Sequence, residues 1–210
     1  MKKNNWLLLV IVLNLVLTFS SSHLLDLNRL TFDFYSSFLE ENQVEDFINT
    51  QKKWEWLGYV IMPFVILLRS SLVAVCLSVG LFFYDIQNKI KFKDFFKVAI
   101  LGEFVILSVG IVKLLYFLYI KVDYTLQDVQ QYYPLSYINF LDVSKMEPWL
   151  IYPLQTINLF EIAYFFVLVY GVHKLLKNNF WKSFEITAAS YGSGLTIWLG
   201  LVMFLVLNLT

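Results

Sequence analysis

Five apolar stretches of about 20 residues each constrain this chain more than any other feature. Such stretches are typical of membrane-spanning helices, because about 20 helical residues cross the hydrocarbon core of a bilayer. The chain is 59% hydrophobic and only 15% charged, which lies outside the range of soluble globular domains. The sequence therefore predicts an all-α integral membrane protein, a five-helix transmembrane bundle in a single membrane domain over residues 1–210. The expected spans are about 6–25, 57–84, 98–120, 157–175 and 184–207.

The first apolar stretch follows Lys2 and Lys3 and has two interpretations. It is either an uncleaved membrane anchor or a secretory signal peptide, since Ser20 and Ser22 are small enough for a cleavage site. Numbering from Met1 favours the anchor. Both interpretations place the N-terminus in the cytoplasm, and cleavage would leave the orientation of the other four spans unchanged.

Lysines are concentrated in three short segments of the chain. The two longer connections, 26–56 and 121–156, hold five cations against eleven carboxylates. Because cytoplasmic loops carry the excess of Lys and Arg, the short segments should be cytoplasmic and the long ones outside. We therefore expect a multi-pass protein of the bacterial inner (plasma) membrane with a cytoplasmic N-terminus and an extracytoplasmic C-terminus. The lysines are Lys2, Lys3, Lys89, Lys91, Lys93, Lys97, Lys174, Lys177 and Lys182.

The two outer segments differ in character. In the first, apolar residues recur at helical spacing between Leu24 and Trp56, which predicts amphipathic extracytoplasmic helix on the membrane surface or over the bundle. Its polar face is not basic, so a protein surface is at least as good a contact as anionic lipid. The second segment is rich in aromatic residues and interrupted by prolines, which predicts an irregular interfacial loop or a membrane-dipping lid. The first stripe comprises Leu27, Leu30, Phe34, Tyr35, Phe38 and Leu39.

Four charges inside the predicted spans form the candidate site, an intramembrane polar cluster of Arg69, Glu103, Lys113 and Glu161. A charge near the middle of a bilayer costs roughly 2.5–3.5 kcal/mol on insertion scales, so it should find a partner. At about 1.5 Å per residue, Lys113 and Glu161 match best in depth. Arg69 could reach either carboxylate, whereas Glu103 should lie near the cytoplasmic surface and be solvated or pair with loop lysines.

The predicted cluster has two main interpretations. Static pairs between helices would fix the register of a bundle, as polar residues commonly do in membranes. Alternatively, buried ionisable groups line a polar cavity for an ion, a proton or a lipid headgroup. Snorkelling to an interface is a third option. Glu161 and Asn14 could also contact a separate subunit.

The last span contains small residues at four-residue spacing. Ala188 with Gly192, and Ser190 with Gly194, form overlapping pairs that let two helix backbones approach closely. A phosphate-binding glycine loop is disfavoured because the lysine and the preceding strand are missing. The segment therefore predicts helix packing.

The motifs of common enzyme classes are missing. The sequence contains no HExxH, CxxC, GxSxG or Walker motif, so zinc proteolysis, thiol redox chemistry, serine hydrolysis and nucleotide binding lack their residues. The two histidines, His23 and His173, fall on opposite predicted faces of the membrane and cannot share a metal. We expect no enzyme activity, catalytic residue, cofactor, metal site or nucleic-acid partner.

The C-terminal stretch Asn179–Leu207 resembles the last hairpin of the Yip family of five-span membrane proteins. In that family a short basic turn leads into a helix that opens with serine, followed by small residues and an aromatic-glycine pair. The resemblance covers about the last 110 residues and implies a five-span fold. Eukaryotic members are trafficking adaptors that engage small GTPases, but the acidic cytosolic domain of those members is absent here. The matching residues are Lys182, Ser183, Ala188 or Ala189, Tyr191 and Gly192.

Together these features predict a non-enzymatic subunit or scaffold of a membrane protein complex. The alternative is a small transporter or lipid-handling protein that uses Arg69, Lys113 and Glu161 as a polar intramembrane cavity. Expected partners are membrane lipids and either another membrane protein or further copies of the chain.

Overall fold

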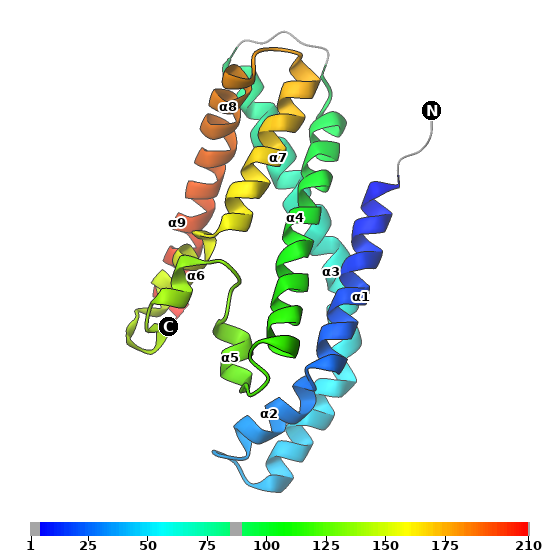
Figure 1. Cartoon of the computed structure of the whole chain (residues 1–210), viewed down its shortest axis with the longest axis vertical. Coiled ribbons are helices and arrows are strands. Elements are labelled where there is room, and N and C mark those ends of the chain that lie inside the picture. The colour runs from blue at the N-terminus through cyan, green and yellow to red at the C-terminus, as the bar shows by residue number, and fades with distance from the viewer. Residues whose placement is uncertain (1–4, 85–89, 210) are drawn as a thin grey trace. The chain divides into compact units, whose positions relative to one another are not determined.

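The computed structural model describes residues 5–84 and 90–209, and these residues are almost entirely helical (Figure 1). Five stretches among them are long and apolar enough to cross a membrane, which confirms the predicted all-helical class and the number of candidate spans. They are α1 (Trp6–Leu24), α3 (Glu41–Phe83), α4 (Phe92–Tyr119), α7 (Leu159–Leu176) and the run formed by α8 (Phe180–Thr187), the π-helical turn η3 (Ala188–Gly192) and α9 (Ser193–Leu209).

Shorter helices occupy the predicted outer segments. The described residues contain no β-strand, only an isolated bridge between Ser136 and Asn158. The second outer segment is irregular, as expected, with four short helices interrupted by turns. The short elements are α2 (Leu27–Tyr35), α5 (Leu126–Gln131), the 3-10 helices η1 (Tyr137–Phe140) and η2 (Val143–Lys145), and α6 (Pro148–Thr156).

Helix α3 extends beyond the predicted second span of residues 57–84. It does not begin near Leu57 but at Glu41, and it continues unbroken for 43 residues. No glycine or proline occurs between Glu41 and Trp56, so nothing in the backbone ends the helix where the hydropathy changes. The change at Leu57 therefore marks where the helix becomes apolar, not where it starts.

The predicted amphipathic helix of the first outer segment is divided in two. Helix α2 ends at Tyr35, where the Ser36 hydroxyl donates to the Phe32 carbonyl at 2.6 Å and the Ser37 hydroxyl donates to the Phe34 carbonyl at 2.6 Å. Such local side-chain bonds compete with helix continuation. The chain then enters α3, and the Tyr35 and Phe47 rings meet with centroids 4.8 Å apart.

Contacts divide the chain into two compact units, and α3 and α4 each contribute to both. The first unit comprises residues 1–66 and 107–132. Within it, α4 approaches α1 at Gly110, where an added Cβ would strike Leu17. Phe117 is buried against Tyr132, with ring centroids 5.5 Å apart. The prediction of a single membrane domain over residues 1–210 stays a prediction.

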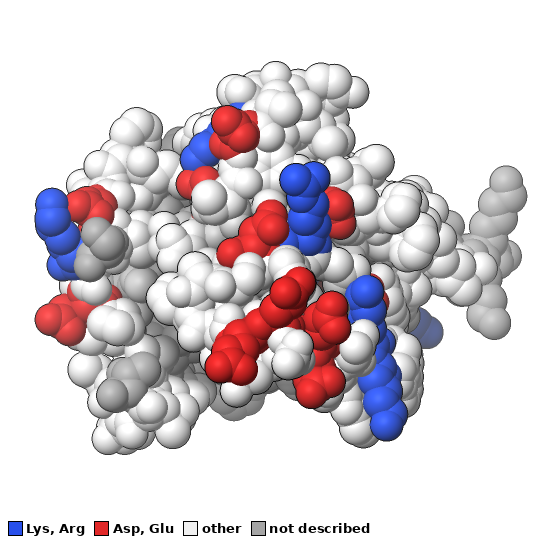
Figure 2. All heavy atoms as spheres, turned by 90° about the horizontal axis from the view of Figure 1, so that it is seen from below, with Lys and Arg blue, Asp and Glu red and all other residues white. Residues whose placement is uncertain are grey.

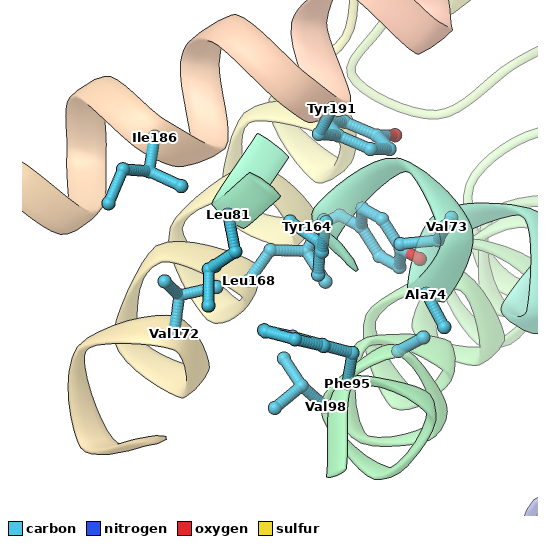
Figure 3. Packing of buried hydrophobic residues seen from close by; sticks show 12 residues of the cluster. Val73, Ala74, Leu81, Phe95, Val98, Tyr164, Leu168, Val172, Ile186 and Tyr191 are labelled. Atoms are coloured by element: carbon cyan, nitrogen blue, oxygen red, sulfur yellow. The ribbon is translucent and has the colours of Figure 1, made fainter. Parts of the chain in front are cut away.

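The second unit comprises residues 67–106 and 133–210 and contains the main apolar core (Figure 3). Two glycines let its helices approach closely. An added Cβ at Gly171 of α7 would strike Val98 of α4, and one at Gly102 of α4 would strike the Tyr164 ring of α7. The core side chains are Val73, Ala74, Leu77, Leu81, Phe95, Val98, Ala99, Tyr164, Leu168, Val172, Ile186 and Tyr191.

Candidate functional site

Arg69 and Glu103 form a buried ion pair between α3 and α4. The Arg69 Nε donates to Glu103 Oε1 at 3.0 Å, and Nη2 donates to Oε2, so the guanidinium binds both carboxylate oxygens. Ser70 adds a third donor through its hydroxyl, 3.1 Å from Oε1. The Glu103 side chain is fully buried, whereas 42% of the Arg69 side chain is exposed. Glu103 is therefore a fully compensated carboxylate.

Of the partners predicted for Glu103, the structure shows Arg69. The sequence interpretation counted from Val98, placed Glu103 near the membrane surface and made it solvated or paired with loop lysines. Helix α4 begins at Phe92, so Glu103 lies about 16 Å along the helix by its rise. At this position Glu103 lies beside Arg69 and Ser70, and its partner is not a lysine.

Glu161 has a different environment at the start of α7. Asn158 caps this helix, and its side-chain oxygen accepts a hydrogen bond from the Glu161 backbone N–H at 2.7 Å. The Tyr191 hydroxyl of η3 donates to Glu161 Oε1. Within the described residues, no Lys, Arg or His forms an ion pair with Glu161. Its carboxylate thus has one neutral donor and no bonded cation.

Tyr164 joins these groups, although sequence reasoning did not include it in the cluster. It lies one helical turn after Glu161, and its ring centroid is 5.6 Å from that of Tyr191. Arg69, Glu103 and Glu161 all lie close enough to affect its hydroxyl electrostatically. The residue is only 2% exposed, yet its hydroxyl has no hydrogen-bond partner in the described part of the chain. The i, i+3 spacing from Glu161 was the available sequence signal.

Figure 3 shows where the two tyrosines lie in the core of the second unit. Their rings occupy one end of the cluster, while Leu168, Val172 and Ile186 lie towards the other end. The Tyr164 ring lies against α4 at Gly102, the residue before Glu103. The apolar core thus fixes both tyrosine rings, and the Tyr191 hydroxyl reaches the charged Glu161.

Tyr133 extends the group of polar residues outside the candidate spans. Burial raises the pKa of its hydroxyl, the negative charge of Glu161 adds to the increase, and the positive charge of Arg69 opposes it. A raised pKa means that the neutral phenol is favoured. Tyr133 can therefore contribute a neutral hydroxyl near both charges.

Lys113 is not in the same unit as the other three predicted site residues. It belongs to the first unit, whereas Arg69, Glu103 and Glu161 belong to the second. It forms no hydrogen bond or ion pair with any described side chain. The proposed match between Lys113 and Glu161 therefore stays a prediction, while the other three charges form the candidate site.

The small residues of the last span have two different environments. Ser190 and Gly194 pack against α3, since an added Cβ at Gly80 would strike Ser190 and one at Gly194 would strike Cys76. Gly192 has no atom within 4 Å of its Cβ position, so the predicted packing role of Ala188 with Gly192 stays a prediction. Residues 188–192 form a π-helical turn, which is rare and occurs mostly as a single turn within an α-helix.

A cavity of about 330 Å³ lies in the second unit between residues 75–82 of α3 and residues 90–95. Its lining is mostly aliphatic and aromatic, and none of the four predicted charges contributes to it. Across residues 5–84 and 90–209, no three His, Cys, Asp or Glu side chains are grouped in a way that could hold a metal ion.

No protein-family model, curated protein or solved structure matches this chain. The resemblance to the Yip family therefore stays a prediction that rests on the C-terminal motif.

Proposed function

We propose that this chain is a non-enzymatic subunit or scaffold of a membrane protein complex in the bacterial inner membrane. The observation that carries the proposal is a helical extension of the first unit, residues 27–56, which we term the α2–α3 projection. It comprises α2, the linker after it and the polar first part of α3. The predicted position of this projection is outside the cytoplasm.

The length of α3 supports a projection beyond the membrane. At about 1.5 Å per residue, its 43 residues extend roughly 64 Å, about twice the 30 Å hydrocarbon core. The apolar part from Leu57 to Phe83 is already sufficient to cross. Residues 41–56 add about 24 Å of helix that spanning does not need.

The projection is poorly covered by the rest of the chain. Every residue from Asn49 to Gly58 is exposed, and Phe38 and Phe47 are 73% and 42% exposed. Short helices gain most of their stability from packing of one face, and exposed apolar groups rimmed by polar residues mark interaction sites. A partner surface that covers Phe38 and Phe47 would supply the missing packing.

Charge indicates the kind of partner. The projection has six carboxylates and three basic residues. In Figure 2, Asp and Glu side chains are visible on the face seen from below, with Lys and Arg side chains between them. Complementary charge steers association and selects partners. We infer a protein partner with a basic rim around an apolar contact. The carboxylates are Asp33, Glu40, Glu41, Glu45, Asp46 and Glu55.

The distribution of lysines supports the proposed orientation. Lys93 and Lys97 lie in the first turns of α4, and Lys174 lies in the last turn of α7. Gly171 of α7 packs against Val98 of α4, so these lysines share one end of the second unit. That end is cytoplasmic under the positive-inside rule. Lys2, Lys3 and Lys89, which contributed to the prediction, lie outside the described residues.

Site-specific crosslinking tests the proposal. A photoreactive amino acid at Phe38 should form a discrete crosslinked product in native membranes, and the double charge reversal Glu40→Lys with Glu41→Lys should abolish it. The matched control is Asp142→Lys with Glu147→Lys in the other outer segment, which should leave the product intact. Crosslinking to lipid alone, or a protein product that survives reversal of Glu40 and Glu41, would refute the proposed basic partner.

A small transporter or lipid-handling protein is the second candidate, and Glu161 favours it. This carboxylate lies in a candidate span without a bonded cation among the described residues. Transport predicts that Glu161→Gln abolishes function and leaves a folded, inserted protein. A purely structural role predicts lower thermal stability instead.

A further inference from the structure

The charges of the second unit do not balance around Glu161. Arg69 contributes one positive charge to the cluster, while Glu103 and Glu161 each contribute a negative charge when ionised. The Glu103 carboxylate binds the Arg69 guanidinium directly and accepts a further hydrogen bond from the Ser70 hydroxyl. One carboxylate therefore remains uncompensated in a helix that is apolar enough to cross a membrane.

A carboxylate in such a position has two ways to reduce the cost of its charge. It can bind a cation, or it can take up a proton and become neutral, because burial in a low dielectric disfavours the charged form. The charged and titratable groups around Glu161 are Arg69 from α3, Tyr133 from the segment after α5, Tyr164 from α7 and Tyr191 from η3, and Glu103 of α4 acts on both Arg69 and Tyr164. Arg69, the one cation in this group, is bound to Glu103.

Other contacts oppose complete neutralisation of Glu161. The Tyr191 hydroxyl donates to one of its oxygens, and the N-terminus of α7 favours a negative charge in its first turn. Neither contact supplies a full positive charge. The carboxylate is thus stabilised by two partial contributions and destabilised by its surroundings, which is the balance that permits reversible protonation.

Tyr164 gives independent support for a site that changes its hydrogen bonding. Its buried hydroxyl has an unused donor and unused acceptor positions among the described residues. A buried polar group without a partner costs about 1–3 kcal/mol, so it marks a place where another polar species is accommodated. Tyr164 lies one turn from Glu161 and contacts the ring of Tyr191.

We infer that the cluster of Glu161, Tyr164 and Tyr191 is a proton-binding site, in which Glu161 takes up and releases one proton. In the protonated state the cluster of Arg69, Glu103 and Glu161 is neutral. In the deprotonated state it has one excess negative charge, held by the Tyr191 hydroxyl and the helix N-terminus. This inference concerns the second unit and does not depend on the partner proposed for the α2–α3 projection.

Infrared difference spectroscopy of the full chain in lipid nanodiscs tests this inference. The carbonyl stretch of a protonated carboxylic acid is separate from the bands of carboxylates. The wild-type protein should show this band at about neutral pH, where an exposed glutamate with its usual pKa of about 4.3 is ionised. Glu161→Gln should remove the band, whereas Glu185→Gln, at an exposed glutamate of α8, should retain it.

A second variant tests the same site in case Glu161→Gln does not fold. Tyr191→Phe keeps the aromatic ring but removes the donor to Glu161, so the carboxylate form is less favoured. The pH midpoint of the band should rise by about one pH unit or more, because a hydrogen bond to a charged group contributes that much. A midpoint unchanged in Tyr191→Phe would overturn the inference.

Two further outcomes would also contradict the proton site. A neutral-pH band that persists in Glu161→Gln would assign the proton to another group, and absence of the band in the wild-type protein would show that Glu161 stays ionised. Replacing potassium by sodium at equal ionic strength should leave the midpoint unchanged. A midpoint that falls in sodium would identify a sodium site instead.

Discussion

At the scale of single residues, Arg69 and Glu103 show how helices apolar enough to cross a membrane accommodate charge. Each group would be costly alone in a low dielectric. Together they form a bidentate ion pair, and the Ser70 hydroxyl donates a further hydrogen bond to Glu103. Because Glu103 is fully buried and Arg69 is not, removal of the arginine is the more informative perturbation.

Arg69→Ala should destabilise the protein by about 3 kcal/mol or more, since it leaves an uncompensated buried charge. Removing both groups in Arg69→Leu with Glu103→Leu should recover much of that loss. Thermal unfolding in detergent measures both effects. Lys97→Ala is the control, because its ion pair with Asp94 is exposed and should contribute about 1 kcal/mol or less. Equal losses in Arg69→Ala and the double variant would contradict a direct pair.

Gly102 offers a second test at this scale. Gly102→Ala should lower the free energy of unfolding by about 1–3 kcal/mol, because its Cβ would overlap the Tyr164 ring. Gly200→Ala is a matched helical control with no atom within 4 Å of the added Cβ. It should be neutral or slightly stabilising, since alanine favours helix more than glycine does. Equal effects at both positions would show that Tyr164 does not pack against α4.

At the scale of elements, the structure separates what hydropathy determines from what it does not. The long apolar helices were predictable because 20 or so apolar residues have few alternatives to a bilayer. The start of α3 was not predictable, because the helix continues through the point where the hydropathy changes. The π-helical turn at Ala188–Gly192 was also missed. The sequence indicated small residues there, but which of them pack depends on the tertiary contacts of Gly80 and Cys76.

Helix α5 provides a prediction outside the candidate spans. Thr125 and Asp128 form a capping box, and Lys121 pairs with Asp128 at 2.6 Å. The hydrogen bond from Lys121 lowers the pKa of Asp128, and the backbone N–H of Thr125 adds to the decrease. The stabilisation is therefore fully present above the ordinary aspartate pKa of 3.8, and it is lost as the pH falls through the lower folded-state pKa.

Amide hydrogen exchange of α5 measures this effect. Protection in the wild-type helix should fall as the pH drops below about 4, after correction for the intrinsic exchange rate. Asp128→Asn should show weaker protection at neutral pH and little further change in acid. Thr125→Ala should cost about 0.5–2 kcal/mol of local stability, as other N-cap removals do. Identical acid profiles for wild-type protein and Asp128→Asn would exclude the carboxylate as the cause.

At the scale of the whole molecule, the charge distribution predicts an orientation that depends on all five candidate spans. The chain has a single cysteine, Cys76, so Cys76→Ala gives a background for single-cysteine labelling. Glu41→Cys should react with a membrane-impermeant maleimide in cells whose inner membrane is intact. Lys177→Cys should react only after the membrane is opened. The reverse pattern would invert the proposed topology and place the α2–α3 projection in the cytoplasm.

The candidate site was only partly predictable at this scale. Arg69, Glu103 and Glu161 were identified because charges in apolar stretches are rare and costly. Their neighbours Tyr164 and Tyr191 were not identified, because in the sequence these two residues look like ordinary aromatic residues. Only helix packing brings them to the charges. The projection was predicted as an acidic outer segment, but its continuity with α3 and its exposure are visible only in the structure.

The most direct test of the proposed subunit role is native mass spectrometry of the chain extracted at its natural level in mild detergent. We predict a stoichiometric protein partner that is retained in the wild-type complex. The same partner should be lost in Glu40→Lys with Glu41→Lys and retained in Asp142→Lys with Glu147→Lys. A lone chain or a homo-oligomer that carries only lipid would contradict the scaffold role and favour the transport or lipid-handling alternative.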